Sequence, residues 1–599
     1  MIVPMAKVYL AARQRDRDRL LDALGGLGAV HLAPVDAARA VPEPDTRDAL
    51  DRTRRAIQVL ESVEPAGARP DLAAAQAVAE VLRIQREAAE AQARLGVLHR
   101  HIQALEPWGD TRLAQFESLR KAGVLPRFFA VPRKRLADVK GEFVHPIRPW
   151  PGGRVLVAVV NRSGDVLVPE GSEELPLPSE DRPTLRAEAA QLDAALKAGA
   201  ARLAALAHLV PAVRAERDRL RAAADWAVAA KGGLQEEHVY ALQGWVPEAK
   251  APALAAELAD RGVSVAVRAL EPGPDEQPPT LIRYPWWARP MAGLFQVLGT
   301  VPGYREYDVS VAFMIALPIF AAILISDAGY GLLYLLLPII FYRKMARAGA
   351  RDLAHLIMVV GVLSLAWGLL TASFFGFDIS RWMGLEAPLI PVDMQKEHMN
   401  LLMYVSITLG AIHLALAHLW RAWKAFPHLH FLSEAGWAVW FWGMFGVVRM
   451  LLLKDPATFD EFLRQTRYPY LLVSGGVLAI LFAAPDRNVL KMLGLGLAKF
   501  PLAMIGTFGD TVSYVRLMAI GLGGSALAVA FNNMAGMLPI FATIPTLIFA
   551  HALNVALSIV ALLAHGVRLN MLEFSNNLGM EWSGYAYAPF TRTRLQEEA

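Results

Sequence analysis

The 599-residue sequence contains no cysteine, which excludes disulfide bonds and thiolate metal sites. It also lacks a GxxxxGK[ST] loop, an HExxH sequence and any clustered His, Asp and Glu at metal-ligand spacing. We therefore expect no P-loop binding of ATP, no bound metal and no other cofactor. Charge is nearly balanced: 60 Lys and Arg face 56 Asp and Glu, a formal net charge of +4, with no long basic run. This balance argues against a nucleic-acid partner.

The first twenty residues also lack the basic segment and unbroken apolar stretch of a cleaved signal peptide, so we expect the first half of the chain to stay in the cytoplasm. What the sequence does contain is apolar residues. They make up 55% of the chain, and the mean hydropathy is +0.32. A chain this long and this apolar predicts several domains, at least one of them in a membrane.

The first 280 residues predict an α+β cytoplasmic arm. A β-α-β pattern at residues 1–40 returns at 235–271, which predicts that the two pieces form one proximal lobe. Long Ala-, Arg- and Glu-rich stretches at 45–107 and 182–231 predict an antiparallel helical coiled coil, with an ordinary helical bundle as the alternative. Short strand patterns within residues 110–180 predict a second small α/β lobe. The arm is therefore expected to be two lobes joined by paired helices.

The Pro-rich stretch from Pro272 to Pro279 marks a domain boundary, and residues 281–599 predict an α-helical polytopic membrane domain. Apolar runs near the ~20 residues needed to span a bilayer predict eight transmembrane helices, the last two of them long and tilted. A tight hairpin at Asp327 separates the first two, although one tilted span is an alternative. Basic residues follow the second, fourth and sixth runs, which places those loops and both termini in the cytoplasm. The expected spans are 309–326, 328–342, 353–377, 399–420, 432–453, 470–484, 504–531 and 541–567.

Two arginines, Arg516 and Arg568, lie inside the last two apolar runs. A charge at the centre of a spanning helix costs roughly 2.5–3.5 kcal/mol on insertion scales, so each needs a countercharge. The nearest acids, Asp510 and Glu573, lie at the polar ends of these runs. We therefore expect the countercharge on another subunit.

The residues around these arginines resemble the a/I subunit of rotary V/A-type ATPases over most of the chain. The Arg516 stretch and the Asp327 turn are the most specific matches. Three positions depart from the family pattern: Gly524 and Ser558 stand where relatives carry a His and an acid, and Asp308-Val309-Ser310 replaces Asp-Pro-Thr. The matching segments are Ser513-Tyr514-Val515-Arg516-Leu517, Arg568-Leu569, Glu573-Phe574, Gly244-Trp245-Val246-Pro247, Pro278-Pro279-Thr280, Asp327-Ala328-Gly329-Tyr330-Gly331, Ser373-Phe374-Phe375-Gly376, Leu409-Gly410 and His413-Leu414.

The resemblance implies a non-catalytic stator subunit of a proton-translocating rotary ATPase or ATP synthase in the cell membrane. Its implied partners are a proteolipid ring with a membrane carboxylate, peripheral stalk subunits of the E/G type, a central-stalk adaptor of the C/d type, and lipid. A self-contained secondary ion transporter is the alternative, and it would carry in-chain partners for its buried charges. A membrane-tethered scaffold would leave Arg516 unexplained.

Arginine stays ionised, so its expected role is to separate two half-channels electrostatically rather than to relay protons. Polar residues along the last span would hydrate the half-channels. Several alternatives remain open: Arg568 could reach the interface, His551 and Asn554 could bond between helices, and Glu434 could be a relay or a helix-start acid. His413, His418 and Arg449 are expected to be structural or interfacial. The candidate ion-translocation residues are Arg516, Arg568, Ser513, His551, Asn554, Ser558, His565, Glu573 and Glu434.

Overall fold

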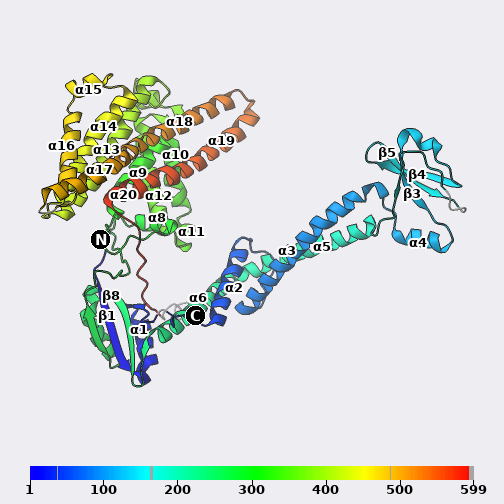
Figure 1. Cartoon of the computed structure of the whole chain (residues 1–599), viewed down its shortest axis with the longest axis horizontal. Helices are drawn as coiled ribbons and strands as arrows, with labels where there is room; N and C mark the ends of the chain where they lie inside the picture. Colours follow the sequence, from blue (N-terminus) through cyan, green and yellow to red (C-terminus); the bar gives the residue numbers. More distant parts are fainter. Residues whose placement is uncertain (37, 162–165, 486–487, 592–599) are drawn as a thin grey trace. The chain divides into compact units, whose positions relative to one another are not determined.

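Helices dominate the structure, a computed structural model that describes residues 1–36, 38–161, 166–485 and 488–591 (Figure 1). The chain divides into two units. One comprises Met1–Val8, Trp245–Leu254 and Arg268–Pro589, and the other is mainly Tyr9–Gly244 and Ala255–Val267. A largely helical chain with several apolar helices is what the sequence predicts.

The N-terminal pieces build a sheet with the strand order β2-β8-β1-β9, in which β7 pairs with β8. Leu20, Leu21 and Leu24 of α1 are fully buried because they recur on one helix face. Strands separated by about two hundred residues of sequence thus share one sheet. The elements are β1 (Met5–Arg13), α1 (Arg17–Leu27), β2 (His31–Ala33), β7 (Leu234–Gln235), β8 (Val239–Pro247), α7 (Leu254–Asp260) and β9 (Ala266–Leu270).

Among the described residues, four of the helices between these strands in sequence pack on one another through a core that includes Ala56, Val81 and Val213. Ion pairs tie them together: Arg94 to Glu188, Arg202 to Glu80 and Arg214 to Glu61, at 2.7, 2.8 and 2.7 Å. The Arg202 guanidinium lowers the pKa of Glu80 by hydrogen bonding to its carboxylate. The predicted helical stretch 45–107 is interrupted between Glu61 and Ala74, and the predicted stretch 182–231 is interrupted by the 3-10 turn Ala207–Leu209. The helices are α2 (Pro44–Glu61), α3 (Ala74–Ala104), α5 (Arg182–Leu206) and, after a short 3-10 turn, α6 (Val210–Gly232).

A second sheet lies between α3 and α5 in sequence, with the strand order β4-β5-β3-β6. Alternate residues of β3 and β5, among them Phe129, Val131 and Val157, form its buried core. Asp181 caps the N-terminus of α5, and hydrogen bonds from the Leu113 and Thr184 backbone lower its pKa. The elements are α4 (Leu113–Lys121), β3 (Arg127–Pro132), β4 (Phe143–Trp150), β5 (Arg154–Val160) and β6 (Glu173–Leu175).

Six helical stretches among the described residues are long and apolar enough to cross a membrane. One of them, Arg182–Gly232, is the α5–α6 stretch, whose ion pairs to α2 and α3 favour its place among those helices. Three predicted spans fall on shorter apolar helices: α9 (Ser310–Ile325), α10 (Ala328–Ile340) and α16 (Tyr468–Leu481). The other helices of this region are α8 (Met291–Leu298), α11 (Tyr342–Arg347), α12 (Arg351–Leu370), α13 (Lys396–Ala425), α14 (Phe431–Leu453) and α15 (Phe459–Gln465).

The last two helical stretches are much longer than a bilayer crossing. Val489–Gly536 has 48 residues and Ile540–Leu578 has 39, or about 72 and 58 Å at 1.5 Å per residue. They comprise α17 (Val489–Ser513), α18 (Val515–Gly536), α19 (Ile540–Ala561), two π-helical segments and α20 (Ser575–Leu578). The α18 and α19 helices lie side by side (Figure 1). Large apolar side chains on them are exposed, including Leu502 at 79% and Phe541 at 79%, as expected of a surface covered by lipid or a partner.

Glycines let several of these helices cross at backbone contact. A Cβ added at Gly368 of α12 would lie 2.0 Å from the Ala328 nitrogen at the start of α10, and one at Gly331 of α10 would lie 2.3 Å from the Leu365 nitrogen. At Gly521 of α18, an added Cβ would lie 2.2 Å from the carbonyl oxygen of Ile323 in α9. The Arg516-bearing helix is therefore fixed on α9 by a contact that only glycine permits.

Replacing Gly368 with Ala should destabilise the chain by about 1–3 kcal/mol or more, because two helix backbones would have to separate. The matched control is Gly494→Ala, which adds the same methyl group to a helical glycine with nothing within 4 Å. The control should melt at or slightly above the wild-type temperature, since Ala is the better helix former. Thermal unfolding of the purified protein in detergent checks this, and equal melting temperatures for the two variants would refute the packing argument.

Candidate functional site

The Asp327 carboxylate, 1% exposed, organises one end of the candidate site by accepting four hydrogen bonds. Its donors are the Tyr330 nitrogen at 3.0 Å, the Phe375 nitrogen at 2.9 Å, the Gly376 nitrogen at 2.9 Å and Ser373 Oγ at 2.7 Å. These bonds cap α10 and fold the turn between the short strands β10 (Ser373–Phe374) and β11 (Phe377–Asp378). The Asp327-Ala328-Gly329-Tyr330-Gly331 and Ser373-Phe374-Phe375-Gly376 motifs are thus joined through the Asp327 carboxylate.

A chain of polar side chains, here the Tyr330 network, begins beside this turn. Tyr330 Oη lies 2.8 Å from His551 Nδ1 and accepts a hydrogen bond from Asn554 Nδ2 at 2.9 Å. His551 Nε2 lies 3.1 Å from Asn532 Oδ1, so α10, α18 and α19 all contribute. Ser558 Oγ donates to the Asn554 carbonyl at 2.8 Å and extends the polar line along α19. The predicted residues His551, Asn554 and Ser558 therefore lie together.

The two arginines share one carboxylate. Arg516 Nη2 lies 2.6 Å from Glu573 Oε1, and Arg568 Nε lies 3.5 Å from the same oxygen. Glu573 is 4% exposed, whereas the arginine side chains are 27% and 50% exposed. Among the described residues no other acid pairs with either guanidinium. The sequence led us to expect the countercharge of both arginines on another subunit. This expectation is wrong for one of the two positive charges, because Glu573 of the same chain balances it.

The geometry that allows this pairing is a change of helix type, which the sequence pattern did not predict. The last helix is π-helical over Leu562–Gly566 and again over Leu569–Phe574. Because π-helical hydrogen bonds join residues five apart, they bring Arg568 and Glu573 toward one face. A regular α-helix would keep His565 and Arg568 on the stripe of His551, Asn554 and Ser558. The regular α-helix that this prediction assumes ends at Ala561, so the continuation of the stripe to His565 and Arg568 stays a prediction.

Polar atoms without a hydrogen-bond partner gather near this ion pair. Among the described residues they include Glu573 Oε2, His565 Nδ1, Asn570 Oδ1 and His413 Nε2, all of them buried. Buried polar atoms are costly unless they are hydrogen-bonded, and ordered water is the usual partner. The region around Glu573 is therefore suited to hold water.

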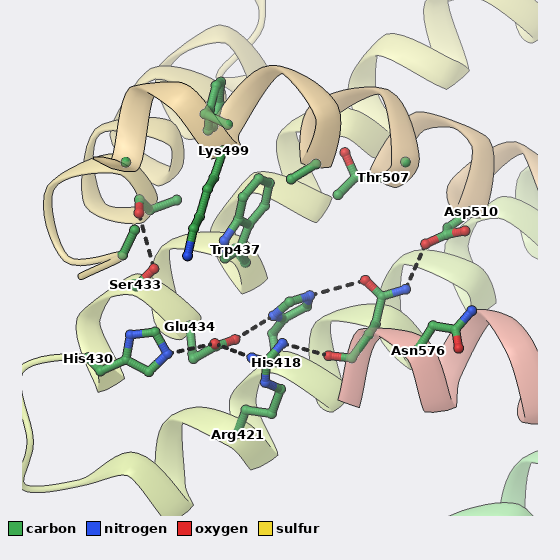
Figure 2. A pocket seen from close by; sticks show the side chains of 17 residues that line it. His418, Arg421, His430, Ser433, Glu434, Trp437, Lys499, Thr507, Asp510 and Asn576 are labelled. Carbon is green, nitrogen blue, oxygen red and sulfur yellow. Dashed lines mark hydrogen bonds and ion pairs between the residues drawn. The ribbon is translucent and has the colours of Figure 1, made fainter. Parts of the chain in front are cut away.

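Glu434, 4% exposed at its side chain, lies at the centre of a second polar cluster (Figure 2). Its Oε2 lies 2.8 Å from His418 Nδ1, and its Oε1 lies 2.8 Å from Arg421 Nη2 and 3.2 Å from His430 Nε2. The Lys499 side chain reaches toward the same group in Figure 2. Glu434 therefore lies in the first turn of α14 and also contacts three cationic or titratable side chains.

This cluster continues toward the arginines through Asn577. His418 Nε2 lies 3.2 Å from Asn577 Oδ1, and Asn577 Nδ2 donates to Asp510 Oδ2 and to the Glu573 carbonyl, each at 2.7 Å. The side chains line a pocket of about 420 Å³ between α13, α14, α16, α17 and α20 (Figure 2). We call this set of side chains the Glu434 network; its members are His418, Arg421, His430, Glu434, Asn577 and Asp510. It ends one helical turn from Glu573, on the side opposite the Tyr330 network.

Some predicted residues play smaller parts. Ser513 contributes only its carbonyl, which accepts a bond from Arg516 Nε at 3.0 Å. His413 stacks on Phe574 with ring centroids 4.3 Å apart and lies 2.7 Å from Tyr514 Oη. Arg449 pairs with Asp455. His413 and Arg449 are thus held by neighbouring side chains, as expected of structural residues, whereas His418 belongs to the Glu434 network.

Sequence reasoning missed several members of the two networks. Tyr330 lies in the Asp327 turn motif, Asn532 lies sixteen residues after Arg516, and Asn577 lies one helical turn after Glu573. His418 and Arg421 share a face of α13, because they are three residues apart. Glu434 lies on the next helix, α14. For Asn577, helical spacing relative to Glu573 was an available signal.

Chemically, the arrangement consists of two polar networks that can hold water, with the Arg516–Glu573 ion pair between them. Histidine and carboxylate groups can pass protons, and amide groups can hold the bound water between them, while a guanidinium cannot give up its proton. The Arg516–Glu573–Arg568 group carries two positive charges and one negative charge, so one positive charge remains at a partly exposed face. That face can bind one further carboxylate.

Comparison with known proteins identifies relatives over nearly the full chain. A "V-type ATP synthase subunit I 1" from Treponema pallidum is 29% identical, over 98% of this chain and all of the relative. A "V-type ATP synthase subunit I" from Borreliella burgdorferi is 26% identical, over 99% of this chain and all of the relative. An "A-type ATP synthase subunit I" from Methanothermobacter thermautotrophicus is 24% identical over 56% of this chain. No protein-family model matches the chain.

Among solved structures, the crystal structure of the cytoplasmic N-terminal domain of subunit I, a homologue of subunit a of V-ATPase, aligns with 44% of this chain and all of that one. The identity is 19% and the TM-score 0.18, a superposition too poor to compare the two folds. The similarity to subunit I therefore rests on the sequence relatives alone.

The Glu434 network predicts a measurable loss of stability. Glu434→Gln should lower the free energy of unfolding by about 1–3 kcal/mol, because Arg421 would remain largely buried without its carboxylate partner. Glu397→Gln, an exposed acid in the first turn of α13, is the control and should change stability little. Thermal unfolding in detergent compares the two, and equal losses would mean that Glu434 has no special partners.

Proposed function

We propose that this chain, a homologue over nearly its full length of subunit I of the V-type and A-type ATP synthases, is the non-catalytic stator subunit of such a rotary ATPase. In this role it forms two ion half-channels against a rotating ring of proteolipid subunits and couples proton translocation to rotation. The chain carries no P-loop sequence, so nucleotide chemistry belongs to other subunits.

The observation that carries this proposal is the charge count at Glu573. Arg516 and Arg568 share one carboxylate, which leaves one positive charge without a partner in the described part of the chain. The partly exposed Arg516 guanidinium would pair with a carboxylate presented by each rotor subunit in turn. Because an adjacent positive charge favours the ionised carboxylate, a rotor acid would lose its proton on approaching Arg516.

Two separate paths would then supply and remove protons. The Glu434 network supports a path on the side of the basic loops, which the positive-inside tendency makes cytoplasmic. The Tyr330 network supports a path from the opposite side. Arg516 lies between them and cannot relay a proton, so the only route across is on the rotor.

The finer features of the fold are also part of the proposal. We assign residues 281–599 to the membrane domain, with eight spans in the cell membrane and both termini cytoplasmic. Residues 1–280 would be the stator arm: a proximal lobe at 1–40 and 235–271, a coiled coil at 45–107 and 182–231, and a distal lobe at 110–180. The lobes would bind peripheral stalk subunits of the E/G type, and the membrane side would contact a central-stalk adaptor of the C/d type.

The alternative, a self-contained secondary transporter, would have in-chain partners for its buried charges, and Glu573 is such a partner. The full-length similarity to ATP synthase subunits and the uncompensated second arginine nevertheless favour the rotary ATPase. Copurification from native membrane separates the two, because a rotary ATPase brings a proteolipid ring and stalk subunits with it.

Replacing Arg516 with Ala should abolish ATP-driven proton pumping while the complex still assembles. Lys should substitute poorly, because its ammonium lacks the planar, always ionised fork. Pumping by proteoliposomes and native gel analysis of the complex provide the two measurements.

The matched control is Arg464→Ala, which removes an exposed arginine whose acidic partner, among the described residues, is the exposed Asp460 of its own helix. Arg464→Ala should pump at the wild-type rate. Near-normal pumping by Arg516→Ala would contradict the proposed function.

The transported ion should be the proton, because the two networks offer histidines and amides rather than a cluster of carboxylates and carbonyls suited to sodium. ATP-driven acidification of proteoliposomes should therefore occur in sodium-free buffer and collapse on addition of an uncoupler. Acidification that requires added sodium would reverse the choice of ion but not the role of Arg516.

A further inference from the structure

Glu573 differs from every other acid near the arginines in being shared. One oxygen, Oε1, contacts both guanidinium groups at 2.6 and 3.5 Å, whereas the other, Oε2, is buried without a partner among the described residues. Asp510, the next acid, is already held by Asn577. A carboxylate between two cations, nearer to one and with a free oxygen, is able to shift from one to the other.

We propose that Glu573 is the resting counterion of Arg516 and transfers to Arg568 each time a rotor carboxylate arrives. This inference rests on the proposed function, since it needs a rotor that presents carboxylates. Arg516 would exchange one carboxylate for another and would never be left unpaired in the membrane, which is the costly state.

The local structure supports a short movement. Arg568 and Glu573 lie five residues apart at the π-helical segment Leu569–Phe574, where the hydrogen-bonding pattern brings such residues together. Arg568 is 50% exposed and has no other acidic partner among the described residues, so it can receive the carboxylate. One proton moves in this step. The rotor acid releases it to the adjoining water path as it ionises, and Glu573 neither gains nor loses a proton.

The exchange sets how strongly Arg516 holds the rotor carboxylate. Glu573 competes for Arg516 and weakens that hold, so the rotor group can leave and bind a proton again. Without Glu573 the rotor carboxylate would be held more tightly, and a lower pH would be needed to protonate it. Without Arg568, Glu573 would compete more strongly, and the rotor carboxylate would be protonated at a higher pH.

The test uses the intact complex in proteoliposomes and measures pumping rate against the pH of the compartment in which the rotor acid is protonated again. Glu573→Gln should slow pumping about tenfold and move the alkaline limb of this profile about one pH unit lower. Arg568→Gln should move the same limb in the opposite direction. Glu573→Asp keeps the charge and should retain the limb near its wild-type position.

The opposite signs separate this proposal from a structural role, because a variant that only disturbs packing lowers the rate without moving the limb. Unmoved limbs, or limbs that move in the same direction, in Glu573→Gln and Arg568→Gln would overturn the counterion exchange. If Glu573→Gln fails to assemble, an upward shift in Arg568→Gln supports the proposal and its absence overturns it. Loss of pumping in Arg516→Ala would leave the proposed function standing in either case.

Discussion

The structure depends on the cost of placing two guanidinium groups inside apolar helices. Arginine cannot become neutral, so a guanidinium within an apolar helix needs an acid, a hydrogen-bonding shell or water. The chain provides one acid for two arginines and brings that acid into reach with two π-helical segments near the end of the last helix. The remaining positive charge makes the site incomplete on its own, which is the property that a stator facing a moving partner requires.

Rigid surroundings keep this incomplete site in place. Gly521 allows the backbone of α18 to contact α9, while Asp327 ties the start of α10 to the turn that touches Ala528 of α18. Large exposed apolar side chains occur on the outer faces of α17 and α19. The helices that carry the arginines are therefore fixed on one side by close packing and leave the other side free for lipid or a partner.

Much of this could be predicted from sequence, for identifiable reasons. Apolar runs and helical spacing predicted several of the apolar helices that the structure contains, and a charge in such a run singled out Arg516 and Arg568 without any structure. The Arg516–Glu573 pair could not be predicted, because helical spacing assumes a regular α-helix and the π-helical segments carry no clear sequence signal. Tyr330 and Asn577 were missed for a different reason: their partners, His551 and His418, lie more than one hundred and fifty residues away in sequence.

The central claim is that Arg516 faces a carboxylate from another chain. The most direct measurement is a high-resolution cryo-electron microscopy structure of the intact complex purified from native membrane. The account predicts a carboxylate from a ring subunit opposite the Arg516 guanidinium, with the Glu434 and Tyr330 networks opening to opposite sides of the membrane. A structure in which Arg516 faces lipid, with Glu573 as its sole acidic neighbour in every rotational state, would contradict it.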